Sequence, residues 1–213
     1  MTPNSSNLNN PGSQAAQTLI SFDPGSAQTA YCILRGNKHT QHYVSSGTIP
    51  STLEHARAFL NANPADAYAV EICGRFAPNP KIMLSLLKTS EFAGVLIGLA
   101  FATGKPVFTL PANAPRGRTS WRVLLCGRQA GEVAGDATVK QYLARSLNMP
   151  KVSNNHARDA AGLGVVALRC DLKVSILEFA DSNHPNPGKT PSSTPSTFTR
   201  RVNEALAAQR NNS

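Results

Sequence analysis

Residues 20–26 read Ile-Ser-Phe-Asp-Pro-Gly-Ser, and this stretch decides how the chain begins to fold. The apolar residues before Asp23 predict a buried strand, and Pro24 with Gly25 predicts a turn into a second strand at 29–34. Asp23 would therefore end a rigid strand, which fixes its carboxylate as a metal site requires. The alternative is an Asp in an ordinary turn.

Periodicity and turn residues predict the remaining elements outward from this hairpin. We expect strands at 18–22, 29–34, 42–49, 67–72 and 106–110, and helices at 53–61, 80–103, 137–147 and 157–169. This order predicts an α/β fold. Its mixed five-stranded sheet would join an antiparallel meander to parallel strands, with helices on its faces.

Charge and hydropathy narrow the class of partner. The 213 residues include 21 Lys and Arg against 12 Asp and Glu, a net charge of +9. Such a basic chain suits a polyanion, either nucleic acid or an acidic membrane surface. The most apolar stretch, Phe92 to Ala102, is shorter than the roughly 20 residues of a membrane span, so we expect no membrane partner.

Composition also divides the chain. Residues 1–17 predict a disordered leader without a secretion signal, and 18–179 predict the globular domain. Residues 180–199 predict a Pro/Ser/Thr-rich linker, and 200–213 a basic tail that is either a short helix or a loose segment. The four cysteines lack zinc-site spacing, so we expect reduced, mostly buried thiols and a cytoplasmic protein.

Two further sites carry acids at the ends of predicted elements. Glu71 ends the apolar strand Ala69-Val70-Glu71-Ile72, where it needs an ion partner or a bound cation; the alternative is a salt bridge to Arg75. His156 and Asp159 share one face at the start of a helix by their i, i+3 spacing. The alternative for Asp159 is a simple preference for the positive end of the helix dipole.

Three carboxylates and one imidazole form a donor set that suits Mg²⁺, with Mn²⁺ as a substitute. Two such ions per site can activate water and stabilise the leaving oxygen in phosphodiester hydrolysis. The basic remainder of the chain would hold the phosphates. The sequence therefore predicts a metal-dependent nuclease.

Four segments resemble the RuvC family of Holliday junction resolvases, which has the RNase H-like fold. They are the opening hairpin around Asp23, Val70-Glu71, the stretch from Glu91 to Val107, and His156-Ala157-Arg158-Asp159-Ala160. The similarity runs from about Leu19 to Cys170, with the segments in the family's order and spacing.

The resemblance implies that Asp23, Glu71, His156 and Asp159 are the catalytic, metal-binding residues, with Asp23 between two ions. It implies a homodimer that nicks four-way DNA junctions symmetrically, with the helix at 80–103 in the dimer interface. Phe76 is similar in place to a family Phe at the junction centre, although its equivalence is open, as is that of Lys140 to a family Lys.

The segment from Pro115 to Arg128 holds four arginines and the only tryptophan, with no acid, which predicts a DNA-contacting element. The alternative is a core Trp121 beside a solvated basic loop. The full set of candidate DNA contacts is Arg75, Phe76, Arg116, Arg118, Trp121, Arg122, Arg128 and Lys140.

Three other readings stay open. An actin-like or sugar-kinase ATPase shares the Asp-x-Gly-Ser hairpin, but such proteins need two domains. A non-catalytic junction-binding module would have the same fold. A nuclease acting on structured RNA or other branched DNA would have the same active site, because fold does not determine substrate.

Overall fold

A five-stranded mixed sheet lies at the centre of a computed structural model that describes residues 15–73, 80–111, 120–126, 135–150 and 154–170. In chain order its strands are β1 (Gln17–Asp23), β2 (Gln28–Gly36), β3 (Gln41–Pro50), β4 (Ala67–Ile72) and β5 (Val107–Pro111). They are arranged as β3-β2-β1-β4-β5. The first three are antiparallel neighbours, while β4 runs parallel to both β1 and β5. The predicted RNase H-like sheet is confirmed.

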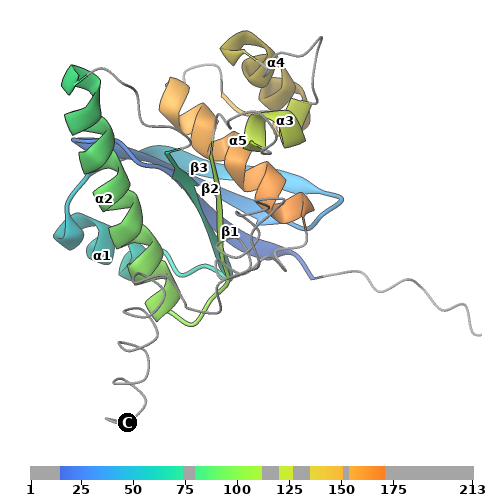
Figure 1. Cartoon of the computed structure of the whole chain (residues 1–213). Coiled ribbons are helices and arrows are strands. Elements are labelled where there is room, and N and C mark those ends of the chain that lie inside the picture. Colours follow the sequence, from blue (N-terminus) through green and yellow to red (C-terminus); the bar gives the residue numbers. More distant parts are fainter. Residues whose placement is uncertain (1–14, 74–79, 112–119, 127–134, 151–153, 171–213) are drawn as a thin grey trace, which may run out of the picture. The chain divides into compact units, whose positions relative to one another are not determined.

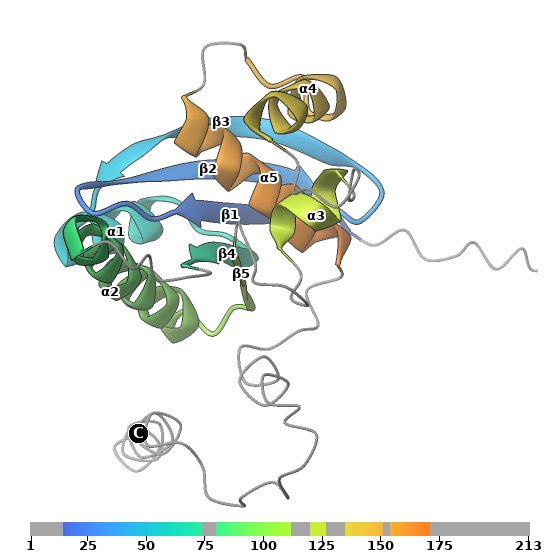
Figure 2. The same cartoon turned by 45° about the horizontal axis from the view of Figure 1, so that its top comes forward.

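Helices cover both faces of this sheet (Figure 1). The helices are α1 (Leu53–Ala62), α2 (Pro80–Ala102), α3 (Trp121–Cys126), α4 (Asp136–Ser146) and α5 (Asn155–Arg169). One hydrophobic core joins the sheet to α1 and α2, and a second joins its other face to α3, α4 and α5. Figure 2 shows the same three layers from a second direction, with α5 running along the sheet.

The alternation of β1 decides which core receives each side chain. Ile20 and Phe22 lie in the core under α1 and α2, whereas Leu19 lies in the core under α5. Because side chains of a strand alternate between faces, Asp23 falls on the same side as Leu19. The strand therefore directs its terminal carboxylate toward the α5 layer.

Helix α5 is buried over most of its length and packs on β1, β2 and β4. Small residues permit this close approach. A Cβ atom added at Gly164 would lie 2.7 Å from Oγ of Ser21 and 2.8 Å from Cδ1 of Leu34. The start of α5, with His156 and Asp159, is thereby held against the sheet.

The apolar segment of α2 is longer than the stretch considered in the sequence. Ile82–Ala102 is long and apolar enough to cross a membrane by length and composition alone, with a mean hydropathy of 1.6 over its best window. Only 17% of that window is buried. One face of the helix, including Phe92 and Leu96, packs into the core, so the helix is an integral part of the domain.

The predicted strands and long helices are confirmed to within about two residues at their ends, whereas α3 was not predicted. The expectation of mostly buried thiols was wrong. Cys32 is buried, Cys73 and Cys126 are partly exposed, and Cys170 is exposed; all four are free thiols.

The chain divides into two units, Met1–Ala180 and Asp181–Ser213, and every described residue belongs to the first. The predicted leader is described only at 15–17, where Gln17 already begins β1. The predicted linker and basic tail lie outside the described residues.

Candidate active site

Asp23 ends β1 and is only 8% exposed. The turn after it depends on Gly25, where an added Cβ would lie 2.3 Å from the carbonyl oxygen of Gln28. Oδ2 of Asp23 lies 2.7 Å from Nδ1 of His156, which donates to it when that nitrogen carries the proton. The strand end and the start of α5, 133 residues apart in sequence, therefore meet directly.

Glu71 comes from β4, the parallel neighbour of β1. The register that pairs Phe22 with Val70 brings Glu71 beside Asp23 at the next position. Ala69, two residues earlier, lies in the α5-side core, so Glu71 points to that same side. Its Oε2 accepts a hydrogen bond of 2.8 Å from the indole Nε1–H of Trp121.

The remaining two predicted ligands stand in the first turns of α5. Asn154 caps the helix by accepting a 2.6 Å hydrogen bond from the backbone N–H of Ala157. Cap and packing together fix where His156 and Asp159 lie. The side chain of His156 is 74% exposed, whereas that of Asp159 is 20% exposed.

Arg122 of α3 holds Asp159. Its Nη2 donates to both carboxylate oxygens of Asp159, at 2.7 Å and 2.9 Å, and its Nη1 donates to Oδ1 of Asp136 at 2.6 Å. The guanidinium carbon also lies 5.1 Å from the centre of the Trp121 ring. Nε of Arg122 is buried and has no hydrogen-bond partner among the described residues. One guanidinium therefore pairs with both an acid of the site and an exposed acid outside it.

Burial dominates the electrostatics of these acids, because a buried carboxylate loses the hydration of its charged form. Burial raises the pKa of Asp23 to about 6, against the opposing effect of His156. Burial, reinforced by the charge of Asp23, raises the pKa of Glu71 to about 8, although the Trp121 hydrogen bond lowers it. The pKa of Asp159 is also raised by burial, with Arg122 opposing. The negative charges of these acids also act on one another: Asp159 raises the pKa of both Asp23 and Glu71.

The donor set fits a divalent cation of the Mg²⁺ type, being rich in carboxylate oxygen with one imidazole. Buried carboxylates with raised pKa values are also the groups whose ionised form a bound cation stabilises. Within the described part of the chain, however, no three His, Cys, Asp or Glu side chains are grouped as around an ion. Asp23, Glu71 and Asp159 instead contact His156, Trp121 and Arg122 respectively.

Two of the predicted DNA contacts need correction. Trp121 is fully buried, so it cannot stack on a base, and the alternative of a core tryptophan holds. The side chain of Arg122 is 12% exposed and already paired with two carboxylates, so it is not a free phosphate contact. Lys140 is exposed on α4 and stays a candidate. The others lie outside the described residues: Arg75, Phe76, Arg116, Arg118 and Arg128.

Sequence reasoning thus missed what Trp121 and Arg122 do inside the site. The signal was present as a contradiction: a tryptophan and two leucines stood in a stretch interpreted as a DNA-contacting element. A basic loop needs no such apolar residues, so their presence favours a short packed helix.

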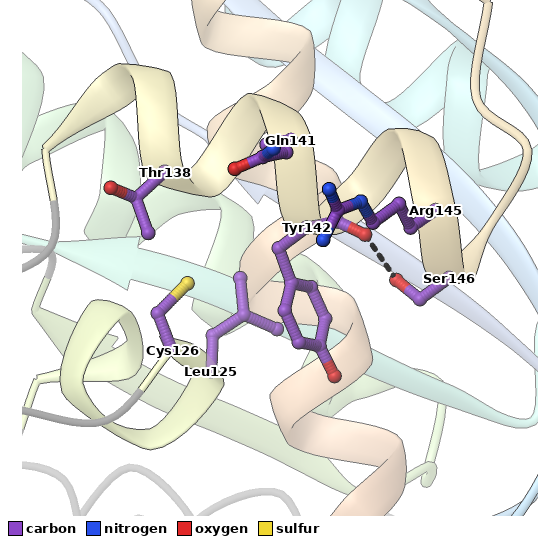
Figure 3. Close-up of a pocket in the computed structure, with 7 residues that line it drawn as sticks. All are labelled: Leu125, Cys126, Thr138, Gln141, Tyr142, Arg145 and Ser146. Carbon is purple, nitrogen blue, oxygen red and sulfur yellow. Dashed lines mark hydrogen bonds between the residues drawn. The ribbon is translucent and has the colours of Figure 1, made fainter.

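A separate cavity of about 530 Å³ lies between α3 and α4 (Figure 3). Its lining contains one charged side chain, Arg145, and no acid; Ser146 bonds the backbone of Tyr142 at 2.8 Å. None of the four predicted ligands lines it, so this cavity is distinct from the candidate active site.

Comparison of structures identifies the fold. RuvC from T. thermophilus, solved in complex with a Holliday junction substrate, superposes with a TM-score of 0.56 and 16% identity, covering 73% of this chain and 96% of that one. A second structure of Thermus thermophilus RuvC gives a TM-score of 0.53 at 16% identity, covering 70% and 92%. The chain shares its fold with RuvC.

The likeness to RuvC spans nearly the full length of that protein. At this level of identity it concerns the fold, and the chemistry depends on the residues described above. No protein-family model matches the sequence, and no curated protein matches it either.

Proposed function

We propose that this protein is a metal-dependent, structure-selective endonuclease that hydrolyses phosphodiester bonds in branched DNA, with four-way junctions as the main substrate. The observation that carries the proposal is the 2.7 Å contact of Asp23 at the end of β1 with His156 at the start of α5, on the face of a RuvC-like sheet toward which Glu71 of β4 also points. The fold is that of a protein solved with a Holliday junction substrate, which supports the choice of substrate.

Asp23, Glu71, Asp159 and His156 would hold Mg²⁺, or Mn²⁺ in its place, as two ions per site. Bound divalent ions supply Lewis acidity and lower the pKa of water, which is the chemistry that phosphodiester hydrolysis needs. Asp23 belongs between the other ligands, because it contacts His156 and interacts electrostatically with both other acids. Its fixed place at a strand end gives the site its rigidity.

His156 is suited to orient the attacking water or to bind metal. Its Nδ1 faces Asp23, and this contact orients the ring while leaving Nε2 for a ligand or a proton. The His156 side chain is 74% exposed, far more than those of Asp23 and Asp159, so substrate can reach it.

The homodimer is part of the proposal, because one junction presents two symmetric strands to be cut. Helix α2 supports it with large exposed apolar side chains, four of them in its first turns and one near its end, which monomeric proteins rarely leave uncovered. These residues are Ile82, Met83, Leu84, Leu87 and Phe101. A second copy of α2 is a suitable cover, since a two-fold interface uses the same surface on both subunits.

Phosphate contacts would come from the basic residues that flank the site. Lys140 on α4 is exposed, and the arginines at 116, 118 and 128 lie on either side of α3 in the sequence. Their charge supports binding to the backbone of any branched nucleic acid, so charge alone does not separate DNA from structured RNA.

A labelled four-way junction tests the proposal, with linear duplex and structured RNA of equal length as controls. We expect paired nicks in the junction with Mg²⁺ or Mn²⁺, and none with Ca²⁺ or a chelator. Preferential cutting of the RNA would favour the alternative substrate. Tight junction binding without nicking in either ion would favour a non-catalytic module.

A further inference from the structure

Trp121 occupies an unusual position for the only tryptophan of the chain. It is fully buried, yet its one polar atom bonds a carboxylate of the candidate active site, with Nε1 2.8 Å from Oε2 of Glu71. A buried indole N–H needs a partner, and a backbone carbonyl would have been sufficient. Here the partner is a predicted metal ligand.

The surrounding residues make room for this ring. A Cβ atom at Gly162 of α5 would lie 2.5 Å from Cζ3 of Trp121, so the ring packs where α5 has no side chain. Ser120, also fully buried, accepts the backbone N–H of Val123 through its Oγ at 3.3 Å and caps the first turn of α3. The space at Gly162 and the capped first turn of α3 therefore place the Trp121 ring beside Glu71.

We propose that Trp121 is a positioning residue for Glu71, whose indole N–H orients that carboxylate for a divalent cation. The inference rests on the metal-dependent function proposed above. The hydrogen bond engages one lone pair of Oε2 and leaves Oε1 for the ion. It also favours the ionised form of a carboxylate that burial otherwise discourages. Partners behind a metal ligand act in this way in many metal sites.

A positioning role differs from simple core filling in what substitution does to metal affinity. Trp121→Phe keeps an aromatic ring beside Gly162 and removes the N–H. We expect Mn²⁺ binding, measured by calorimetry without DNA, to weaken about tenfold or more, the usual effect of losing a group behind a ligand.

Leu125→Ala provides the matched control. Leu125 lies on the same helix, is 5% exposed and packs in the same core, but it has no hydrogen bond to an acid. This variant should lower the melting temperature while leaving the Mn²⁺ affinity at the wild-type value. Equal Mn²⁺ affinities in wild type and Trp121→Phe would overturn the proposal.

Fluorescence gives a second test that needs no variant of Trp121. Because the chain has one tryptophan, its emission reports this single ring. We expect Mg²⁺ without DNA to change the emission of the wild type, and to leave that of Glu71→Gln unchanged. If the wild type binds Mg²⁺ by calorimetry with no change in emission, the positioning role is wrong. If the wild type binds neither Mg²⁺ nor Mn²⁺ by calorimetry, the proposed function itself fails.

Discussion

The two faces of the sheet depart in opposite ways from the usual arrangement of proteins, in which charged side chains are exposed and large apolar ones are buried. On the α5 side the interior takes in acids: Asp23 is buried, and the pKa of Glu71 is raised by burial. On the α2 side none of the described core residues is charged, but the outer surface of the helix exposes large apolar side chains such as Leu84, which is 67% exposed.

Each departure carries a free-energy cost that packing alone does not explain. A carboxylate away from water loses hydration, and an apolar side chain in water forgoes burial. Proteins accept such departures mainly at functional sites. Under the proposed function, the α5 face would carry the chemistry and the α2 face the assembly.

The largest expected effect comes from Asp23→Asn, which removes the central acid of the α5 face. We expect junction cleavage to fall by at least about 1,000-fold, since metal-based transition-state stabilisation is worth several kcal/mol. Junction binding should persist or strengthen, because one negative charge facing the phosphates is gone. Glu54→Gln, an exposed acid on α1, is the matched control and should cleave normally. Wild-type nicking by Asp23→Asn would remove this residue from the site.

The α2 face is tested by Leu84→Glu. A charge in an apolar interface costs several kcal/mol, so the dimer should weaken by about 100-fold or more and the protein should elute as a monomer in light-scattering chromatography. Val44→Glu places the same charge on another exposed apolar position, at the edge strand β3, and should not alter the assembly. A variant at Leu84 that stays dimeric would refute the assignment of this face.

Local patterns predicted most of the α5 face. The apolar runs before Asp23 and Glu71 placed each acid at the end of a buried strand, whereas the pairing that brings the two strands side by side comes from the structure. The i, i+3 spacing placed His156 and Asp159 on one face of a helix. These signals are short-range, so they can be read without knowing the tertiary structure.

The arrangement of α3 could not be read in this way. It has six residues, too few for a clear helical period, and its stability comes from distant partners. Arg122 bonds acids 14 and 37 residues away, and Trp121 bonds one 50 residues away. In the sequence these residues stand among arginines and resemble a DNA-binding loop, whereas packing directs both of them inward.

Arg122→Gln tests whether the arginine competes with a metal ion for Asp159 on the α5 face. In the protein without metal the guanidinium bonds both oxygens of Asp159, so it competes with any second cation for that carboxylate. Its removal should tighten Mn²⁺ binding by roughly three- to tenfold, equivalent to about 1 kcal/mol. Lys38→Gln removes the same charge from the exposed β2–β3 turn and should change the affinity little. Weaker Mn²⁺ binding in Arg122→Gln would mean that the arginine supports the site instead of competing for it.

The stability of the metal-free protein should also depend on pH. Both acids ionise near pH 4 in the unfolded chain, but burial raises the folded pKa of Asp23 to about 6 and that of Glu71 to about 8. Between these values the folded state binds more protons than the unfolded state, so stability falls as pH rises. We expect the melting temperature to drop by roughly 5 °C from pH 5.5 to pH 8 without metal, for a loss of about 2 kcal/mol. Mg²⁺ at pH 8 should reverse the drop, because it binds the ionised folded site. In Glu71→Gln the decline should be smaller, since one of the two titrating acids is gone; an equal decline would show that burial of Glu71 does not cause it.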